Sequence, residues 1–165
     1  MPHVLILGGH GKIAQHLTPL LLRASHTVTS VIRADDQAPT IRGLAPADGR
    51  GTLHVLIRSL EDVTSQDRAQ AILSEVKPDA VVFSAGAGGK GGADRLGRTG
   101  GAKGEVSRRT VAEVTARLVD AEGLQTSWVD LLDGQEDIDE AVKRVVKEGV
   151  DVAEGEPVYD KVRKA

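Results

Sequence analysis

The sequence predicts an α/β fold in which helices flank a doubly wound parallel sheet that is shortened relative to a full fold of this kind. Two observations predict it. Short apolar runs alternate with amphipathic helical segments, and a glycine-rich turn joins the first run to the first helical segment. The composition agrees, because 165 residues with 40% hydrophobic and 27% charged side chains are typical of one folded domain.

The first 85 residues show four strand-like runs. Each is short and rich in aliphatic or β-branched side chains, and the fourth is continuous and apolar, as buried parallel strands tend to be. The right-handed crossover rule then predicts the strand order 3-2-1-4. The expected strands are 3–7, Thr27–Ile32, Leu53–Ile57 and Ala80–Phe83. The expected helices are Ile13–Leu22, which Pro19 should kink, and Ser65–Val76. Residues 34–51 are expected to form a loop.

The rest of the chain begins with a glycine-rich basic stretch over residues 86–104, where nine of 19 residues are glycine. Helical spacing resumes after Ser107, a good N-cap, and continues to about Val119. Trp128–Leu132 predicts a C-terminal fifth strand, and Asp137–Lys147 predicts a last helix. The segments that follow from these features are 1–85, the 86–104 loop, a helix-strand-helix part over 105–148 and a charged tail over 149–165.

The strongest chemical signal is the turn from Gly8 to Ala14, GGHGKIA, which has the pattern G-x-x-G-x-x-A between a strand and a helix. Gly8 permits a tight turn, Gly11 lets the backbone approach a ligand closely, and Ala14 lets the helix pack close to the strand. The free N–H groups of the helix N-terminus would then face a pyrophosphate. The alternative is that the glycine turn begins the helix and binds no ligand. A Walker A loop is excluded, because it needs the pattern G-x-x-x-x-G-K-[ST] and the sequence lacks it.

The residue after the second strand bears on the type of dinucleotide. Sites that prefer NAD usually have Asp or Glu there, to accept from the ribose 2′-hydroxyl. This chain has Arg33, whose guanidinium could pair with a 2′-phosphate, helped by His10 and Lys12. NADP(H) is therefore the favoured cofactor, and NAD remains possible. In the alternative interpretation Arg33 binds no ligand and is a solvated charge at the end of the strand.

The segments GGHGKIA, VTSVIR and DAVVFSAGAGGKGG together resemble the atypical short-chain dehydrogenase/reductase superfamily, and more narrowly its NmrA-like, NAD(P)-binding members. The resemblance implies a Rossmann-like fold, and makes residues 1–85 its dinucleotide-binding half. One departure is visible after the third strand, where Ser59–Asp62 stands in place of the Asp that often holds the adenine. The resemblance implies that the dinucleotide is lined by Gly8, His10, Gly11, Lys12, Ile13, Arg33, Ser84, Ala85 and Gly86.

Residues 104–112 and 128–134 resemble the C-terminal part of such proteins, so a long internal segment that includes the helix with Tyr-x-x-x-Lys is expected to be missing. Tyr159 is the single tyrosine, and Arg163 stands four residues later, where the superfamily has a lysine. Standard Tyr/Lys reductase catalysis is therefore not expected, and no catalytic residue or substrate is assigned. Alternatives are an oxidoreductase or isomerase that uses other groups or a partner chain, and an inactive truncated product.

Other classes of function are disfavoured by composition. The chain has no cysteine, and its five histidines have no metal-ligand spacing, so no metal site is expected. Residues 1–109 carry a net charge of +4 and residues 110–165 one of −7, and the acidic part argues against a broad nucleic-acid footprint. The 86–104 stretch could bind nucleic acid, but a flexible loop over the cofactor or a scar of the deletion is favoured.

Location and assembly follow from the same analysis. No apolar run is long enough to span a bilayer and no signal peptide is recognised, so a cytoplasmic protein without membrane contact is expected. The fourth strand normally has a fifth beside it. If residues 128–132 do not fill that place, an open aliphatic edge should favour homo-oligomers.

Overall fold

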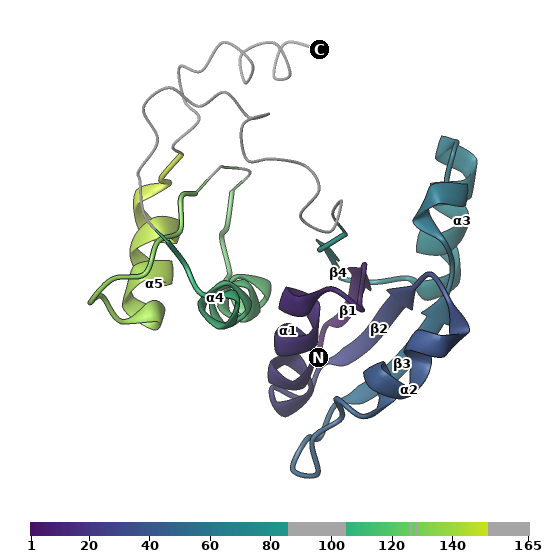
Figure 1. The fold of residues 1–165 in the computed structure, drawn as a ribbon. Helices are drawn as coiled ribbons and strands as arrows, with labels where there is room; N and C mark the ends of the chain where they lie inside the picture. The colour runs from purple at the N-terminus through teal and green to yellow at the C-terminus, as the bar shows by residue number, and fades with distance from the viewer. Residues whose placement is uncertain (86–104, 126, 128, 152–165) are drawn as a thin grey trace. The chain divides into compact units, whose positions relative to one another are not determined.

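The computed structural model describes residues 1–85, 105–125, 127 and 129–151. The chain divides into two compact units, Met1–Gly92 and Ala93–Ala165, and each is described by itself (Figure 1). The finer division expected from the sequence stays a prediction, and the glycine-rich 86–104 stretch and residues 152–165 of the tail lie outside the described residues.

The first unit contains a parallel four-stranded sheet in the order β3-β2-β1-β4, which confirms the predicted order (Figure 1). Leu5 at the centre of β1 is opposite Thr29 of β2 and Val81 of β4. This register brings the carboxyl ends of all four strands to one edge of the sheet. The strands are β1 (His3–Leu7), β2 (Thr27–Ile32), β3 (Thr52–Ile57) and β4 (Ala80–Phe83).

Two helices cover opposite faces of this sheet, α1 (Lys12–Arg23) and α3 (Gln66–Val76) (Figure 1). Ile72 of α3 packs in an aliphatic cluster with Leu5 and Val31. Alternate residues of the same strands point to the other face. The buried side chains there include Val4, Ile6 and Val28 of the strands and Ala14, Leu17 and Leu21 of α1. The core is thus aliphatic, as the scarcity of aromatic residues requires.

The prediction that residues 34–51 form only a loop is wrong. A short 3₁₀ helix, η1 (Asp35–Gln37), leads into α2 (Ala38–Arg42). Proline is favoured in the first turn of a helix, and Pro39 stands there in α2. Ala38 and Ile41 are both buried and pack in one cluster with Ile32, so burial of two apolar side chains holds this short helix on the sheet.

The second unit pairs α4 (Arg108–Asp120) with α5 (Ile138–Glu148). The N-cap Ser107 accepts from the Thr110 N–H at 3.0 Å, as the sequence predicts. The N-cap of α5 is Asp137, which accepts from two backbone N–H groups. Arg117 of α4 forms an ion pair with Asp139 of α5 at 2.7 Å, which joins the two helices.

The expected fifth strand is not found in residues 129–132, and Trp128 lies outside the described residues. The segment ends at Asp133, whose backbone N–H donates to the Glu105 carbonyl at 2.9 Å and whose carboxylate accepts from the Ser107 N–H at 3.0 Å. These contacts fix the entry to α4, and no strand pairing involves the segment among the described residues. In the described ranges, no helix is long and apolar enough to cross a membrane.

Candidate dinucleotide-binding site

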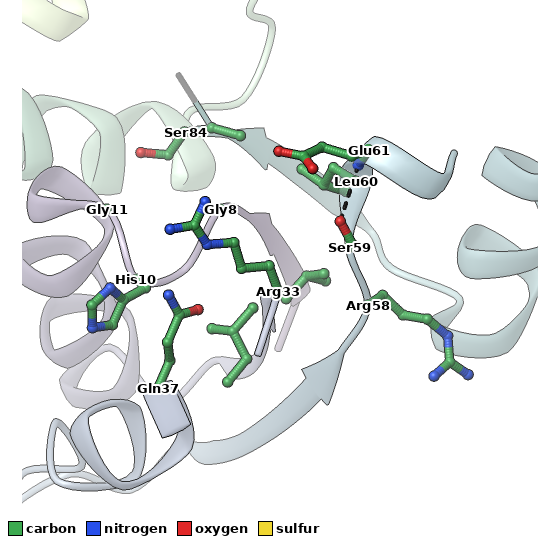
Figure 2. A pocket seen from close by; sticks show the side chains of 13 residues that line it. Gly8, His10, Gly11, Arg33, Gln37, Arg58, Ser59, Leu60, Glu61 and Ser84 are labelled. Atoms are coloured by element: carbon green, nitrogen blue, oxygen red, sulfur yellow. Dashed lines mark hydrogen bonds between the residues drawn. The ribbon is translucent and has the colours of Figure 1, made fainter. Parts of the chain in front are cut away.

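A cavity of about 730 Å³ lies at the carboxyl ends of the four strands, within the first unit (Figure 2). It is centred where the chain leaves β1 between β2 and β4, the place at which an open α/β sheet reverses its winding and usually binds ligands. Its size falls in the range of ligand-binding clefts. The lining residues follow β1 (Gly8, His10, Gly11), end or follow β2 (Val31, Ile32, Arg33, Gln37), follow β3 (Arg58, Ser59, Leu60, Glu61) and follow β4 (Ser84, Ala85).

The turn after β1 requires glycine at Gly8. Its φ is +86°, and an added Cβ would lie 2.7 Å from the Cα and N atoms of Ala85. The Gly11 N–H donates to the Gly8 carbonyl at 2.9 Å, which closes the turn. A Cβ on Gly11 would lie 3.1 Å from that same carbonyl oxygen. At Gly8 and Gly11, therefore, the turn between the ends of β1 and β4 has no room for a side chain.

The N-terminus of α1 opens directly after this turn. Its N-cap is Gly11, which has no side chain to accept from the first N–H groups, and no acidic residue stands in the first turn. The N–H groups of a first helical turn lack partners inside the helix, and the helix dipole places partial positive charge there. These residues fit the pyrophosphate of a dinucleotide, because no side chain caps the helix N-terminus and the lining at Gly8 and Gly11 is bare backbone.

Two arginines line the cavity in different ways. Arg33 is exposed and its guanidinium extends toward the glycine turn (Figure 2), with no hydrogen bond or ion pair to any described residue. Arg58 points away from the cavity (Figure 2), donates to the Ile57 carbonyl at 3.0 Å and lies 3.6 Å from the Glu75 carboxylate. Of these two cations, Arg33 is thus the one available to an anionic ligand.

The ends of β3 and β4 form the remaining wall. The Ser84 N–H donates to the Leu7 carbonyl at 2.9 Å, which holds Ser84 beside the glycine turn. After β3, Ser59 is the N-cap of a short 3₁₀ helix, η2 (Leu60–Asp62), and its hydroxyl accepts from the Glu61 N–H at 3.3 Å (Figure 2). The described ranges hold no cluster of three or more His, Asp or Glu residues suited to a metal ion.

The structure brings together most of the site residues predicted from the sequence. Lys12 and Ile13 begin α1 but do not line the cavity, and Gly86 lies outside the described residues. Sequence reasoning did not include Val31, Ile32, Gln37, Arg58, Ser59, Leu60 or Glu61 among the site residues. For all of them except Gln37, the position at or just after the end of β2 or β3 is the signal that could have found them. The predicted residues that line the cavity are Gly8, His10, Gly11, Arg33, Ser84 and Ala85.

The family model described as the NAD dependent epimerase/dehydratase family matches residues 4–96, which include β2, β3, β4, all of β1 except its first residue His3, and every residue of the cavity. The chain belongs to this family. The predicted relation to dehydrogenases with a Rossmann-like fold is thereby confirmed, while the narrower NmrA-like assignment stays a prediction.

Similar proteins are longer than this chain. The UPF0659 protein C216.03 of Schizosaccharomyces pombe is 42% identical over 90 residues, which are 54% of this chain and 33% of that protein. A solved structure from Bacillus halodurans, described as an NAD-dependent epimerase/dehydratase, is 33% identical with a TM-score of 0.42. The match covers 57% of this chain and 38% of the Bacillus halodurans chain. A Serratia marcescens short-chain dehydrogenase/reductase is 19% identical with a TM-score of 0.42, and the match covers 52% of this chain and 36% of the Serratia marcescens chain. The chain thus spans about a third of the length of its curated relative.

Proposed function

We propose that this chain binds a nicotinamide dinucleotide in the cavity of its first unit, with NADP(H) preferred over NAD(H). The observation that carries the proposal is the uncovered N-terminus of α1, which follows a turn where Gly8 and Gly11 leave no side chain over the backbone. Membership of the epimerase/dehydratase family supports the same class of cofactor.

Three parts of the cavity have a role in this proposal. The pyrophosphate lies where the cavity borders Gly11, so that the N–H groups of the adjoining first turn of α1, those of Lys12 and Ile13 included, face it from beside the cavity. Arg33 pairs with the 2′-phosphate of the adenosine half. Ser84, Ala85 and Gly86 follow β4 and border the other ribose and the nicotinamide, as the superfamily resemblance implies. When bound, the nicotinamide would supply a site for hydride exchange.

We propose further that the chain does not carry out standard Tyr/Lys reductase catalysis. Its single tyrosine is Tyr159, and the residue four positions later in the sequence is Arg163, which cannot lose its proton to tune a neighbouring phenol. The alternatives are an oxidoreductase or isomerase that uses other groups or a partner chain, and an inactive truncated product.

Binding is tested by calorimetric titration of the whole chain with NADPH and NADH. The unaltered chain is expected to bind both, NADPH more tightly. Arg33→Gln should raise the NADPH dissociation constant roughly 10-fold to 100-fold, because a charge-assisted hydrogen bond is lost, and should change the NADH value by less than about threefold. Arg42→Gln is the matched control, since Arg42 is an exposed cation of α2 outside the cavity.

Two results would contradict this assignment. Binding of NADH alone would overturn the role given to Arg33. Absence of heat and of a thermal shift with both dinucleotides at millimolar concentration would overturn the binding function itself, and would favour the inactive product.

The catalytic part of the proposal needs a separate assay. NADPH oxidation with a panel of carbonyl acceptors, at stoichiometric protein, is expected to proceed no faster than in buffer, with no change in Tyr159→Phe. A turnover that Tyr159→Phe abolishes would show that the phenol is catalytic after all. A turnover that survives this substitution would favour the alternative of an enzyme that uses other groups. The cytoplasmic location expected from the sequence stays a prediction.

A further inference from the structure

The sheet of the first unit contains one complete nucleotide-binding half. A doubly wound sheet binds a dinucleotide across two halves, each with the element order β-α-β-α-β, which meet where the winding reverses. The elements β1, α1, β2, α2 and β3 have this order, and their strands are neighbours in the sheet. β4 begins the other half, and the described residues after it form two helices, α4 and α5, and no strand. In the described ranges, β4 is thus the only strand of the second half.

The walls of the cavity have the same asymmetry. All its lining residues except Ser84 and Ala85 end or follow β1, β2 or β3 (Figure 2). Both Arg33, which is available to an anion, and the acidic residue Glu61 are on that side, since they follow β2 and β3. Phe83, the last residue of β4, is 69% exposed, and among the described residues β4 pairs only with β1. The described part of the chain therefore encloses one side of the cavity and leaves the β4 side open.

This asymmetry decides which parts of a dinucleotide gain affinity. The pyrophosphate faces the first turn of α1 and the 2′-phosphate pairs with Arg33, so both are held by the enclosed side. A ring that extends past Ser84 and Ala85 keeps water on its open side, and little of its apolar surface is buried. Water also screens the positive charge that the nicotinamide ring carries in NADP⁺ and lacks in NADPH. Neither the presence of the ring nor its charge should then change the affinity by much.

We propose that the chain binds its ligand through the adenosine half alone. The ligand class is then any nucleotide that carries a 2′-phosphoadenosine 5′-diphosphate group, and the nicotinamide ring contributes neither affinity nor redox selectivity. Such a site holds NADP⁺ and NADPH equally well, unlike a site on a complete doubly wound sheet, where both halves contact the dinucleotide. This inference rests on the proposed dinucleotide-binding function.

Calorimetric titration of the whole chain with four ligands tests the inference. ADP-ribose 2′-phosphate lacks the nicotinamide ring but keeps the rest of NADP(H), and nicotinamide mononucleotide is the opposite half. The dissociation constants of NADPH, NADP⁺ and ADP-ribose 2′-phosphate are expected to agree within about threefold, which is less than about 0.7 kcal/mol. Nicotinamide mononucleotide is expected to give no heat at millimolar concentration.

Arg33→Gln checks that the ligands occupy the same place. It should weaken NADPH and ADP-ribose 2′-phosphate by the same factor, because both present a 2′-phosphate to this side chain. Arg42→Gln is the matched control outside the cavity and should leave both affinities unchanged. Circular dichroism and the thermal midpoint check that each variant is folded. A loss of NADPH affinity in Arg33→Gln without an equal loss for ADP-ribose 2′-phosphate would overturn the shared position.

The outcomes distinguish the inference from the proposed function. If NADPH binds more than about threefold more tightly than ADP-ribose 2′-phosphate, or if nicotinamide mononucleotide binds by itself, the inference is wrong and the proposed function stands. A difference of more than about threefold between NADPH and NADP⁺ has the same meaning. If none of the four ligands binds, the proposed function fails and the inference fails with it.

Discussion

Gly8 is the residue that most directly couples the fold to the cavity. Its φ of +86° turns the chain out of β1, and the missing Cβ leaves space for the backbone of Ala85 at the end of β4. One residue type thus permits both the turn into α1 and the close approach of two strand ends that border the cavity.

Gly8→Ala is expected to destabilise the chain by about 1–3 kcal/mol, because a side chain at positive φ is strained and its Cβ would collide with Ala85. Urea unfolding followed by circular dichroism measures the loss. Gly43→Ala is the control. Gly43 has φ −69° and its added Cβ would meet no atom closer than 3.4 Å, so its effect should stay within about 0.5 kcal/mol. Equal effects of the two substitutions would contradict the role given to the turn.

At this scale the sequence predicts the glycine turn and Arg33 but not Gln37. A glycine pattern between a strand and a helix has a local physical cause, so Gly8 and Gly11 can be identified from neighbours in the chain. Gln37 lines the cavity because η1 leads into α2, and Ile41 of α2 is buried against Ile32. That placement depends on packing, which no pattern of adjacent residues contains.

At the scale of elements, α1 positions the site although it contains a proline. Pro19 lies inside the helix, where it has no N–H for the Gln15 carbonyl. The buried residues on both sides of it, Leu17 and Leu21, show that apolar packing maintains the helix through this defect.

Pro19→Ala should therefore raise the free energy of unfolding by about 1–3 kcal/mol, since it restores a backbone hydrogen bond in a helix interior. Urea unfolding measures it. Pro39→Ala is the control, because Pro39 stands in the first turn of α2, where proline is tolerated, and no gain is expected. A loss of stability in Pro19→Ala would contradict this expectation. It would show that packing of the Pro19 ring stabilises the helix by more than the missing backbone hydrogen bond destabilises it.

The strands and the long helices could be predicted from the sequence, because the spacing of their apolar residues matches the side of each element that is buried. The conformations of 34–51 and 128–132 could not be predicted in this way. α2 has five residues and few apolar side chains, so it depends on the contact of Ile41 with the sheet. Val129 to Leu132 have the composition of a strand, but a strand also needs a partner with free backbone groups. The contacts of Asp133 with Glu105 and Ser107 direct this segment toward α4 instead.

At the scale of the whole molecule, the β4 edge of the sheet bears on assembly. Among the described residues β4 pairs only with β1, and Val81 and Phe83 are 48% and 69% exposed on the same face. Unpaired edges with apolar side chains tend to associate. We therefore propose that copies of the chain associate through this edge, as the sequence analysis expects.

Size-exclusion chromatography with light scattering should show dimers or larger species of the unaltered chain at micromolar concentration. Phe83→Lys should shift it toward the monomer, because a charge on the edge opposes pairing. Leu124→Lys, at an apolar residue of the second unit that is 44% exposed, should leave the association unchanged. A monomeric unaltered chain would rule out this proposal.

The proposed function requires an anionic ligand at the N-terminus of α1, and amide chemical shifts test this most directly. On titration of the ¹⁵N-labelled chain with NADPH, the largest changes are expected at the backbone amides of Gly11, Lys12 and Ile13, with smaller changes at Arg33 and Ser84. Changes confined to amides outside both the cavity and the first turn of α1, or none at millimolar NADPH, would contradict the proposed site.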